Sequence, residues 1–236
     1  MSIKAVLFDL DGTLLPMDQE QFIKAYMTGL STHMAPHGYD PETLVKSIWA
    51  STMAVIKADG TLTNEDMFWH TITSICGEQV KNDIPIFEKF YEDKFQEVSR
   101  SCGYNPLASK VIESLKTKNL TLILATNPVF PAVATNSRIR WAGLNKDDFA
   151  LVTTYENSHF CKPNINYYVE ILNKMSLDPT ECLMVGNDVG EDMIVATLGM
   201  DVFLVTDHII NTKGVDIGQY PHGDLNDLLS YLADKI

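Results

Sequence analysis

An α/β fold, built on a doubly wound parallel sheet with a second, smaller all-helical domain, is predicted by two features of the sequence. Short and nearly continuous apolar runs alternate with helical patterns along most of the chain. Runs that are apolar on both faces are typical of parallel strands covered by helices on each side. One long segment after the first run has helical periodicity and no convincing strand, so it indicates a separate helical unit.

Four or five apolar runs are the predicted strands. They span residues 4–8, 120–125, 149–153, 182–185 and 202–205. Helical patterns lie between or after them, at Pro106 to Lys118, Pro131 to Ala142, Asn164 to Met175, Glu191 to Leu198 and Asp224 to Lys235. Residues 211–223, which contain three glycines and a proline, are predicted to form a loop before the last helix.

Residues 16–100 are predicted to form a helical cap domain, inserted into a core domain of residues 1–15 and 101–236. Four stripes of apolar residues recur at helical spacing in this segment. Asp40 and Pro41 form a good start for the second stripe, and Thr63 with Asp66 resembles a capping box before the third. Most of the aromatic residues here are expected to pack in a helical core.

The charge and cysteine content exclude several classes of protein. The formal net charge is -13 and no Lys/Arg cluster offsets it, which disfavours nucleic acid and anionic membranes as partners. The apolar runs are too short to span a bilayer, and no signal peptide is recognisable.

The four cysteines form no CxxC pair, which predicts neither a zinc site nor a disulfide framework. We expect a cytoplasmic protein that is a monomer or a weak homodimer.

Polar side chains follow the ends of four predicted strands. Because the carboxyl ends of parallel strands meet at one edge of the sheet, these residues should lie together there. They are Asp9 and Asp11 after the first strand, Thr126 and Asn127 after the second, Lys162 in the loop after the third, and Asp188 and Asp192 after the fourth.

The carboxylates at this edge outnumber the one lysine, and two unit charges about 4 Å apart interact by roughly 4 kcal/mol at an effective dielectric near 20. An anionic substrate would therefore be repelled unless a cation were present. Carboxylate, carbonyl and water oxygens suit Mg²⁺, which often bridges carboxylates to a phosphate. No histidine or cysteine accompanies these carboxylates, so zinc is the weaker choice.

Such a set of groups could transfer a phosphoryl group. One aspartate could attack phosphorus as a nucleophile, while the other, protonated because of its anionic neighbours, could protonate the leaving alcohol. Lys162 would neutralise charge on the phosphoryl group, and Thr126 would hold one of its oxygens.

Four motifs resemble those of the haloacid dehalogenase superfamily of hydrolases in order and spacing. They are FDLDGT at 8–13, LATN at 124–127, CKP at 161–163 and GNDVGED at 186–192. The resemblance implies a Rossmann-like core, Mg²⁺, an aspartyl-phosphate intermediate and, usually, phosphatase activity on small molecules. The helical insert resembles the mobile cap that selects substrate in this superfamily.

The resemblance also implies roles for individual residues. Asp9 would be the nucleophile, Asp11 the general acid and base, Thr126 the phosphate-binding hydroxyl with Asn127 beside it, and Lys162 the charge stabiliser that also contacts substrate. Asp188 would join Asp9 and the backbone carbonyl of Asp11 at the metal, with Asp192 in support. The superfamily usually has glycine directly before the first acid of its last motif, whereas Asn187 stands there in this sequence.

Three functions remain open. The first is Mg²⁺-dependent hydrolysis of a small phosphorylated metabolite. The second is a sugar phosphomutase of the same superfamily, and the third is a binding module without turnover. Dehalogenation is disfavoured because the dehalogenases of the superfamily lack an acid at the position of Asp11. The cap has no basic cluster that would indicate a sugar bisphosphate.

Overall fold

A six-stranded parallel sheet forms the centre of the computed structural model, which describes residues 2–235. The strand order is β3-β2-β1-β4-β5-β6, and every neighbouring pair is parallel. The strands are β1 (Ala5–Phe8), β2 (Thr121–Leu124), β3 (Leu151–Val152), β4 (Cys182–Gly186), β5 (Asp201–Val205) and β6 (His222–Gly223). This architecture confirms the predicted doubly wound sheet.

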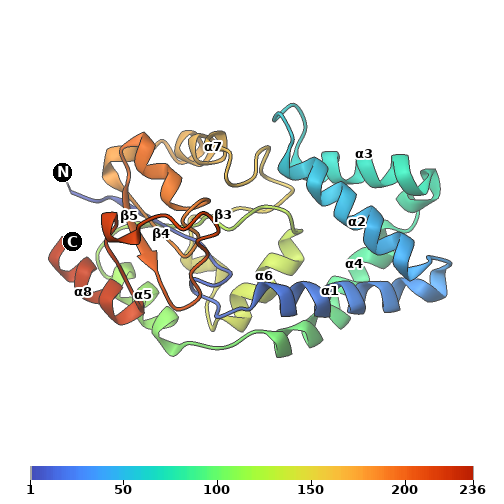
Figure 1. The fold of residues 1–236 in the computed structure, drawn as a ribbon, viewed down its shortest axis with the longest axis horizontal. Coiled ribbons are helices and arrows are strands. Elements are labelled where there is room, and N and C mark those ends of the chain that lie inside the picture. The colour runs from blue at the N-terminus through green and yellow to red at the C-terminus, as the bar shows by residue number, and fades with distance from the viewer. Residues whose placement is uncertain (1, 236) are drawn as a thin grey trace.

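Both faces of the sheet are covered by helices (Figure 1). Along β1, Val6 and Phe8 belong to one hydrophobic cluster, whereas Ala5 and Leu7 belong to another. The first cluster includes residues of α5 (Pro106–Lys116), α6 (Ala132–Trp141) and α8 (Leu225–Lys235), and the second includes residues of α7 (Ile165–Met175). The alternation of side chains along a strand explains why the run is apolar throughout.

The cap domain consists of α1 (Gln19–Met34), α2 (Pro41–Ile56), α3 (Asn64–Cys76) and α4 (Ile84–Glu92), with a 3₁₀ helix over Lys94–Ser101. Two of its helices begin where the sequence predicts. The Asp40 side chain accepts a hydrogen bond from the backbone of Thr43 at 2.9 Å, and the Thr63 hydroxyl accepts one from Asp66 at 3.1 Å. None of the helices in residues 2–235 has both the length and the apolar character needed to cross a membrane.

The chain enters and leaves the cap through two segments that lie side by side. Met17 pairs with Cys102 in an isolated antiparallel bridge, and the Gly103 backbone NH donates to the Pro16 carbonyl at 2.7 Å. Figure 1 shows the cap helices gathered at one end of the molecule, opposite the two termini. The domain boundaries at 15/16 and 100/101 stay predictions.

Three elements differ from the sequence prediction. β3 covers only Leu151–Val152 within the predicted 149–153, and β6 lies inside the predicted loop. β6 has only two residues, one of them glycine, so it has no apolar run that could reveal it. The predicted helix from Glu191 is a 3₁₀ helix that covers Met193–Leu198 and begins after a turn that contains Asp192.

Candidate active site

Four of the predicted site residues, Asp9, Asp11, Asp188 and Asp192, follow the carboxyl ends of β1 and β4. These neighbouring strands flank the point where the strand order reverses, which is where open α/β sheets bind ligands. Asp9 directly follows β1, and its backbone NH donates to the Val185 carbonyl of β4 at 2.9 Å. Asp188 and Asp192 follow β4. The sheet itself therefore brings these carboxylates together.

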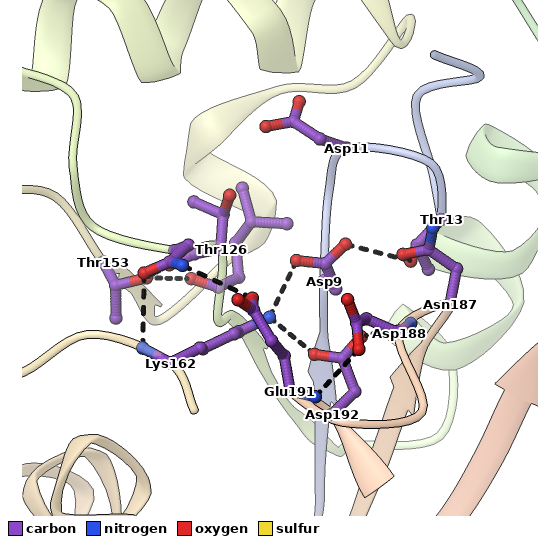
Figure 2. Close-up of polar contacts among 12 residues, drawn as sticks. Asp9, Asp11, Thr13, Thr126, Thr153, Lys162, Asn187, Asp188, Glu191 and Asp192 are labelled. Atoms are coloured by element: carbon purple, nitrogen blue, oxygen red, sulfur yellow. Dashed lines mark hydrogen bonds and ion pairs between the residues drawn. The ribbon is translucent and has the colours of Figure 1, made fainter. Parts of the chain in front are cut away.

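Lys162 connects two of the carboxylates (Figure 2). Its ammonium donates to Asp9 Oδ1 at 2.8 Å and to Asp192 Oδ1 at 2.7 Å. The side chains of Lys162 and Asp192 are each 1% exposed, so these charges would be costly to bury without their partners. Three residues that are distant in sequence thus form one buried ionic cluster.

The turn after Asp9 is held by residues on both sides of it. The Thr13 hydroxyl lies 3.0 Å from Asp9 Oδ2 and 3.0 Å from Asn187 Oδ1. Gly12 has a φ of 86°, and a Cβ atom there would overlap the Asn187 side chain. Asn187 in turn donates to the His208 carbonyl at 2.6 Å. The residue that departs from the superfamily pattern therefore packs against the aspartate turn.

A second turn, directly after β4, fixes the position of Asp188 relative to Asp192. The Asp192 backbone NH donates to the Asp188 carbonyl at 2.9 Å, and the Asp188 NH donates to Asp192 Oδ2 at 3.0 Å. Gly186 makes this possible, because a Cβ atom at that position would overlap the Asp192 carboxylate. The Asp188 carboxylate accepts from the NH groups of Gly190 and Glu191 at 2.7 and 2.9 Å.

The pKa values of Lys162, Asp192 and Glu191 are shifted because these groups are buried close to other charged groups. Burial by itself lowers the pKa of Lys162, but the Asp192 and Asp9 carboxylates outweigh it and hold the pKa well above its ordinary value. Burial raises the pKa of Asp192, against the effect of Lys162. Burial also raises the pKa of Glu191 to about 7, and the carboxylates of Asp188 and Asp192 add to that rise.

Thr126 and Asn127 line the same cavity as Asp9. The Thr126 carbonyl is held by the hydroxyls of Thr153 and Tyr167, at 2.7 and 2.9 Å. Its own hydroxyl has no hydrogen-bond partner within residues 2–235. Asn127 accepts a hydrogen bond from the Lys162 NH and donates one to Glu191, each at 3.3 Å. The loop after β2 therefore presents a hydroxyl to the cavity and holds Lys162 in place.

Asp11 is oriented differently from the other carboxylates. It lines the cavity with Asp9, but its carboxyl group points away from Asp9 and Lys162 (Figure 2) and forms an ion pair with Arg138. Burial raises the pKa of Asp11; the Arg138 guanidinium opposes that rise and the Asp9 charge adds to it. The prediction of Lys162 as the one cation at this edge was wrong, because Arg138 is a second one.

Arg138 is a residue of the candidate site that the sequence motifs did not indicate. It is 1% exposed, donates to Thr135 Oγ1 at 3.2 Å, and its guanidinium lies 4.6 Å from the centre of the Phe130 ring. A signal was present in the sequence. Ala134 and Thr135 stand four and three positions before it, so the inward face of this helix has small residues that leave room for a long side chain.

The donor chemistry fits a divalent cation. Five carboxylates line the cavity, those of Asp9, Asp11, Asp188, Glu191 and Asp192, whereas Lys162 and Arg138 are the two cations paired with them. No group of three or more His, Cys, Asp or Glu side chains in residues 2–235 is already arranged around a metal position. Mg²⁺ does not need one, because it usually takes one or two carboxylates together with waters and substrate oxygens.

The comparison with protein families decides the relationship. The family model for haloacid dehalogenase-like hydrolases matches residues 3–197. The chain belongs to the haloacid dehalogenase-like hydrolase family. It is therefore a hydrolase of that family, and the predicted resemblance is confirmed. No curated protein matches the chain.

Solved structures with the same fold cover nearly the whole hydrolase. A phosphatase of the same superfamily from Thermococcus onnurineus has 17% identity and a TM-score of 0.63, with coverage of 99% of this chain and 100% of that one. A 2-haloacid dehalogenase from Pseudomonas syringae has 22% identity and a TM-score of 0.65, with coverage of 98% and 99%. A provisionally assigned β-phosphoglucomutase from Thermotoga maritima has 17% identity and a TM-score of 0.59, with coverage of 99% and 100%.

Proposed function

We propose that this hydrolase is a Mg²⁺-dependent phosphatase that cleaves a small phosphorylated metabolite through an aspartyl phosphate on Asp9. The observation that carries the proposal is the place of Asp9, at the end of β1 and 2.8 Å from the Lys162 ammonium. A nucleophile beside a buried cation suits attack on an anionic phosphoryl group. The unpaired hydroxyl of Thr126 in the same cavity is suited to bind a phosphoryl oxygen.

The first step forms a bond between a carboxylate oxygen of Asp9 and phosphorus and breaks the bond from phosphorus to the ester oxygen. Asp11 gives its proton to that oxygen, which leaves as the alcohol. Burial supports this role because it raises the pKa of Asp11. Lys162 stabilises the charge on the transferring group, with Thr126 and Asn127 positioned to orient it.

The second step regenerates Asp9. Asp11, now ionised, withdraws a proton from a water molecule that attacks phosphorus, and the bond to Asp9 breaks as phosphate forms. Asp9, Asp188 and the backbone carbonyl of Asp11 are the proposed ligands of Mg²⁺, with Asp192 in support. When bound, this ion would neutralise negative charge on the phosphoryl group.

The cysteines and the net charge are the basis for proposing a compartment and an oligomeric state. We propose a cytoplasmic protein, because Cys76, Cys102, Cys161 and Cys182 are all free thiols, as a reducing compartment would keep them. A monomer or weak homodimer is proposed, since the net charge of -13 disfavours close self-association.

Phosphate release from p-nitrophenyl phosphate tests the proposal. We expect turnover with Mg²⁺, loss of turnover with chelator, and a decrease of about 10³-fold or more in Asp9→Asn. Asp234→Asn, the same change at an exposed helical residue, should be fully active. Acid-quenched protein should carry a phosphoryl group on Asp9. Full activity of Asp9→Asn would contradict the mechanism, and an isomerised sugar phosphate without free phosphate would indicate a mutase instead.

A further inference from the structure

The cavity at Asp9 extends far into the cap. Its volume is about 280 Å³, and it is lined by core residues at one end and by residues of α1, α2, α3 and α4 at the other. We call the cap end, with Phe22, Ile48, Thr52, Phe68, Trp69 and Phe87 in its wall, the aromatic chamber. None of the wall residues between Met17 and Tyr91, all of them in the described range, carries a charge.

Some polar groups of the chamber wall are paired with one another, whereas Gln19, Trp49 and Thr52 also line the cavity. The hydroxyls of Tyr26 and Tyr91 share a hydrogen bond of 2.8 Å. The Trp69 indole NH donates to the Tyr155 hydroxyl at 3.4 Å. Within the described residues of the cap wall, a sugar seated here would have Gln19, Trp49 and Thr52 to satisfy its several hydroxyl groups, and buried polar groups without hydrogen bonds are unfavourable.

The cation that lines the cavity, Arg138, is already engaged. It pairs with Asp11 and packs its guanidinium on Phe130. Lys162 is paired with Asp9 and Asp192 at the other end. A second phosphate or a carboxylate on the substrate would therefore meet no available cation among the wall residues of the described range 2–235.

The volume limits the size of the occupant. An engineered apolar cavity of about 150 Å³ takes a benzene molecule. A cavity of about 280 Å³ thus has room for a phosphoryl group beside Asp9 and one ring, or a branched chain of similar size, in the chamber. Aromatic walls also favour such a body, because they offer large apolar area and edge-to-face contacts.

We propose that the physiological substrate is a phosphomonoester of an uncharged, apolar alcohol about the size of one aromatic ring, whose apolar body occupies the aromatic chamber. This inference rests on the proposed phosphatase function and names its substrate class. It also opposes the sugar phosphomutase alternative, because a hexose phosphate matches the chamber poorly.

Hydrolysis of three esters tests the substrate class. 2-Phenylethyl phosphate, glucose 6-phosphate and ethyl phosphate are all esters of primary alcohols, so they differ mainly in what they place in the chamber. We expect kcat/KM for 2-phenylethyl phosphate to exceed that for glucose 6-phosphate by about 100-fold or more. 2-Phenylethanol should also inhibit hydrolysis of ethyl phosphate competitively in the unaltered protein, which requires no variant to fold.

A matched pair of variants on α2 locates the binding region. Thr52 lines the chamber, whereas the next residue, Met53, is 40% exposed and outside it. Thr52→Phe should fill the chamber and lower kcat/KM for 2-phenylethyl phosphate at least about ten times more than that for ethyl phosphate. Met53→Phe adds an aromatic ring of the same size outside the cavity and should leave both values unchanged.

The outcomes separate this inference from the proposed function. Glucose 6-phosphate cleaved as well as 2-phenylethyl phosphate would overturn the substrate class and leave the phosphatase function standing. Equal effects of Thr52→Phe on both esters would likewise place the apolar body outside the chamber. Failure to release phosphate from any of the three esters with Mg²⁺ would overturn the proposed function, and the substrate class with it.

Discussion

The two ends of the cavity differ in polarity: the core end is charged and the cap end is mainly apolar. At the core end, five carboxylates and two cations are held by hydrogen bonds and ion pairs. At the cap end, the wall is aromatic and aliphatic and carries no charge between Met17 and Tyr91. The charged groups suited to bond breaking and the apolar groups suited to substrate selection therefore lie on separate parts of the chain.

The two ends also differ in how their side chains are held. Lys162 depends on two partners, each in its own motif, so loss of one side chain leaves buried charges without compensation. In the cap, Tyr26 contacts the rings of Phe95 and Phe130 at centroid distances of 6.0 and 5.2 Å, among other aromatic neighbours. Such packing distributes the stabilisation over many contacts, and single changes should have smaller effects.

Removal of the buried ammonium should produce the largest effect. In Lys162→Met, Asp9 and Asp192 would remain as adjacent buried carboxylates, and the free energy of unfolding should fall by about 3–5 kcal/mol. Chemical denaturation measures this loss. Lys174→Met removes a lysine that is 37% exposed and paired with Glu170, and it should cost less than about 1 kcal/mol. Equal losses of unfolding free energy in the two variants would contradict the expectation that the buried ion pairs of Lys162 stabilise the protein more than the exposed pair of Lys174.

Arg138 should have the next largest effect. Arg138→Met leaves Asp11 without its cation, and the free energy of unfolding should fall by about 3 kcal/mol. This loss is smaller than that expected for Lys162→Met because the Asp11 side chain is 20% exposed and can be partly solvated. Arg138 holds the pKa of Asp11 down, so its removal should raise that pKa further. The alkaline limb of kcat/KM should then move to higher pH, because Asp11 keeps its proton longer.

Arg140→Met is the matched control for this variant. Arg140 lies on the same helix, is exposed, and donates to Ser137 rather than to a site residue. Its removal should leave the pH dependence of kcat/KM unchanged. A profile in Arg138→Met that stays in place, or moves to lower pH, would contradict the role of Arg138 as the group that sets the protonation of Asp11.

The smallest effect is expected where the cap contacts the core. Asn64 at the start of α3 is fully buried, and its side-chain amide donates to the carbonyls of Pro128 and Phe160 at 3.1 and 3.3 Å. Asn64→Leu should lower the unfolding free energy by about 1–2 kcal/mol and increase hydrogen exchange around both carbonyls. Asn82→Leu, at an exposed cap position, should do neither. Unchanged exchange in Asn64→Leu would show that the cap is held elsewhere.

Much of the fold could be predicted because it depends on local patterns. Apolar runs such as residues 4–8 and 182–185 indicated buried parallel strands, and the starts at Asp40 and Thr63 indicated two cap helices. β6 could not be predicted, since its two residues form a strand only because β5 lies beside them. The places of Asp9, Lys162 and Asp192 could be predicted as well, because parallel strands deliver their ends to one edge.

Local spacing in the sequence is enough to indicate which residues reach the carboxyl edge of the sheet, because strand direction and the alternation of side chains follow from it. Which of these residues pair depends on how distant segments pack. Asp11 meets Arg138 rather than Asp9, and Thr13 meets Asn187, across 127 and 174 positions of the chain. Only the packing of the four cap helices against one another creates the aromatic chamber. Periodicity says which face of a helix is buried, but it does not say which other face lies opposite.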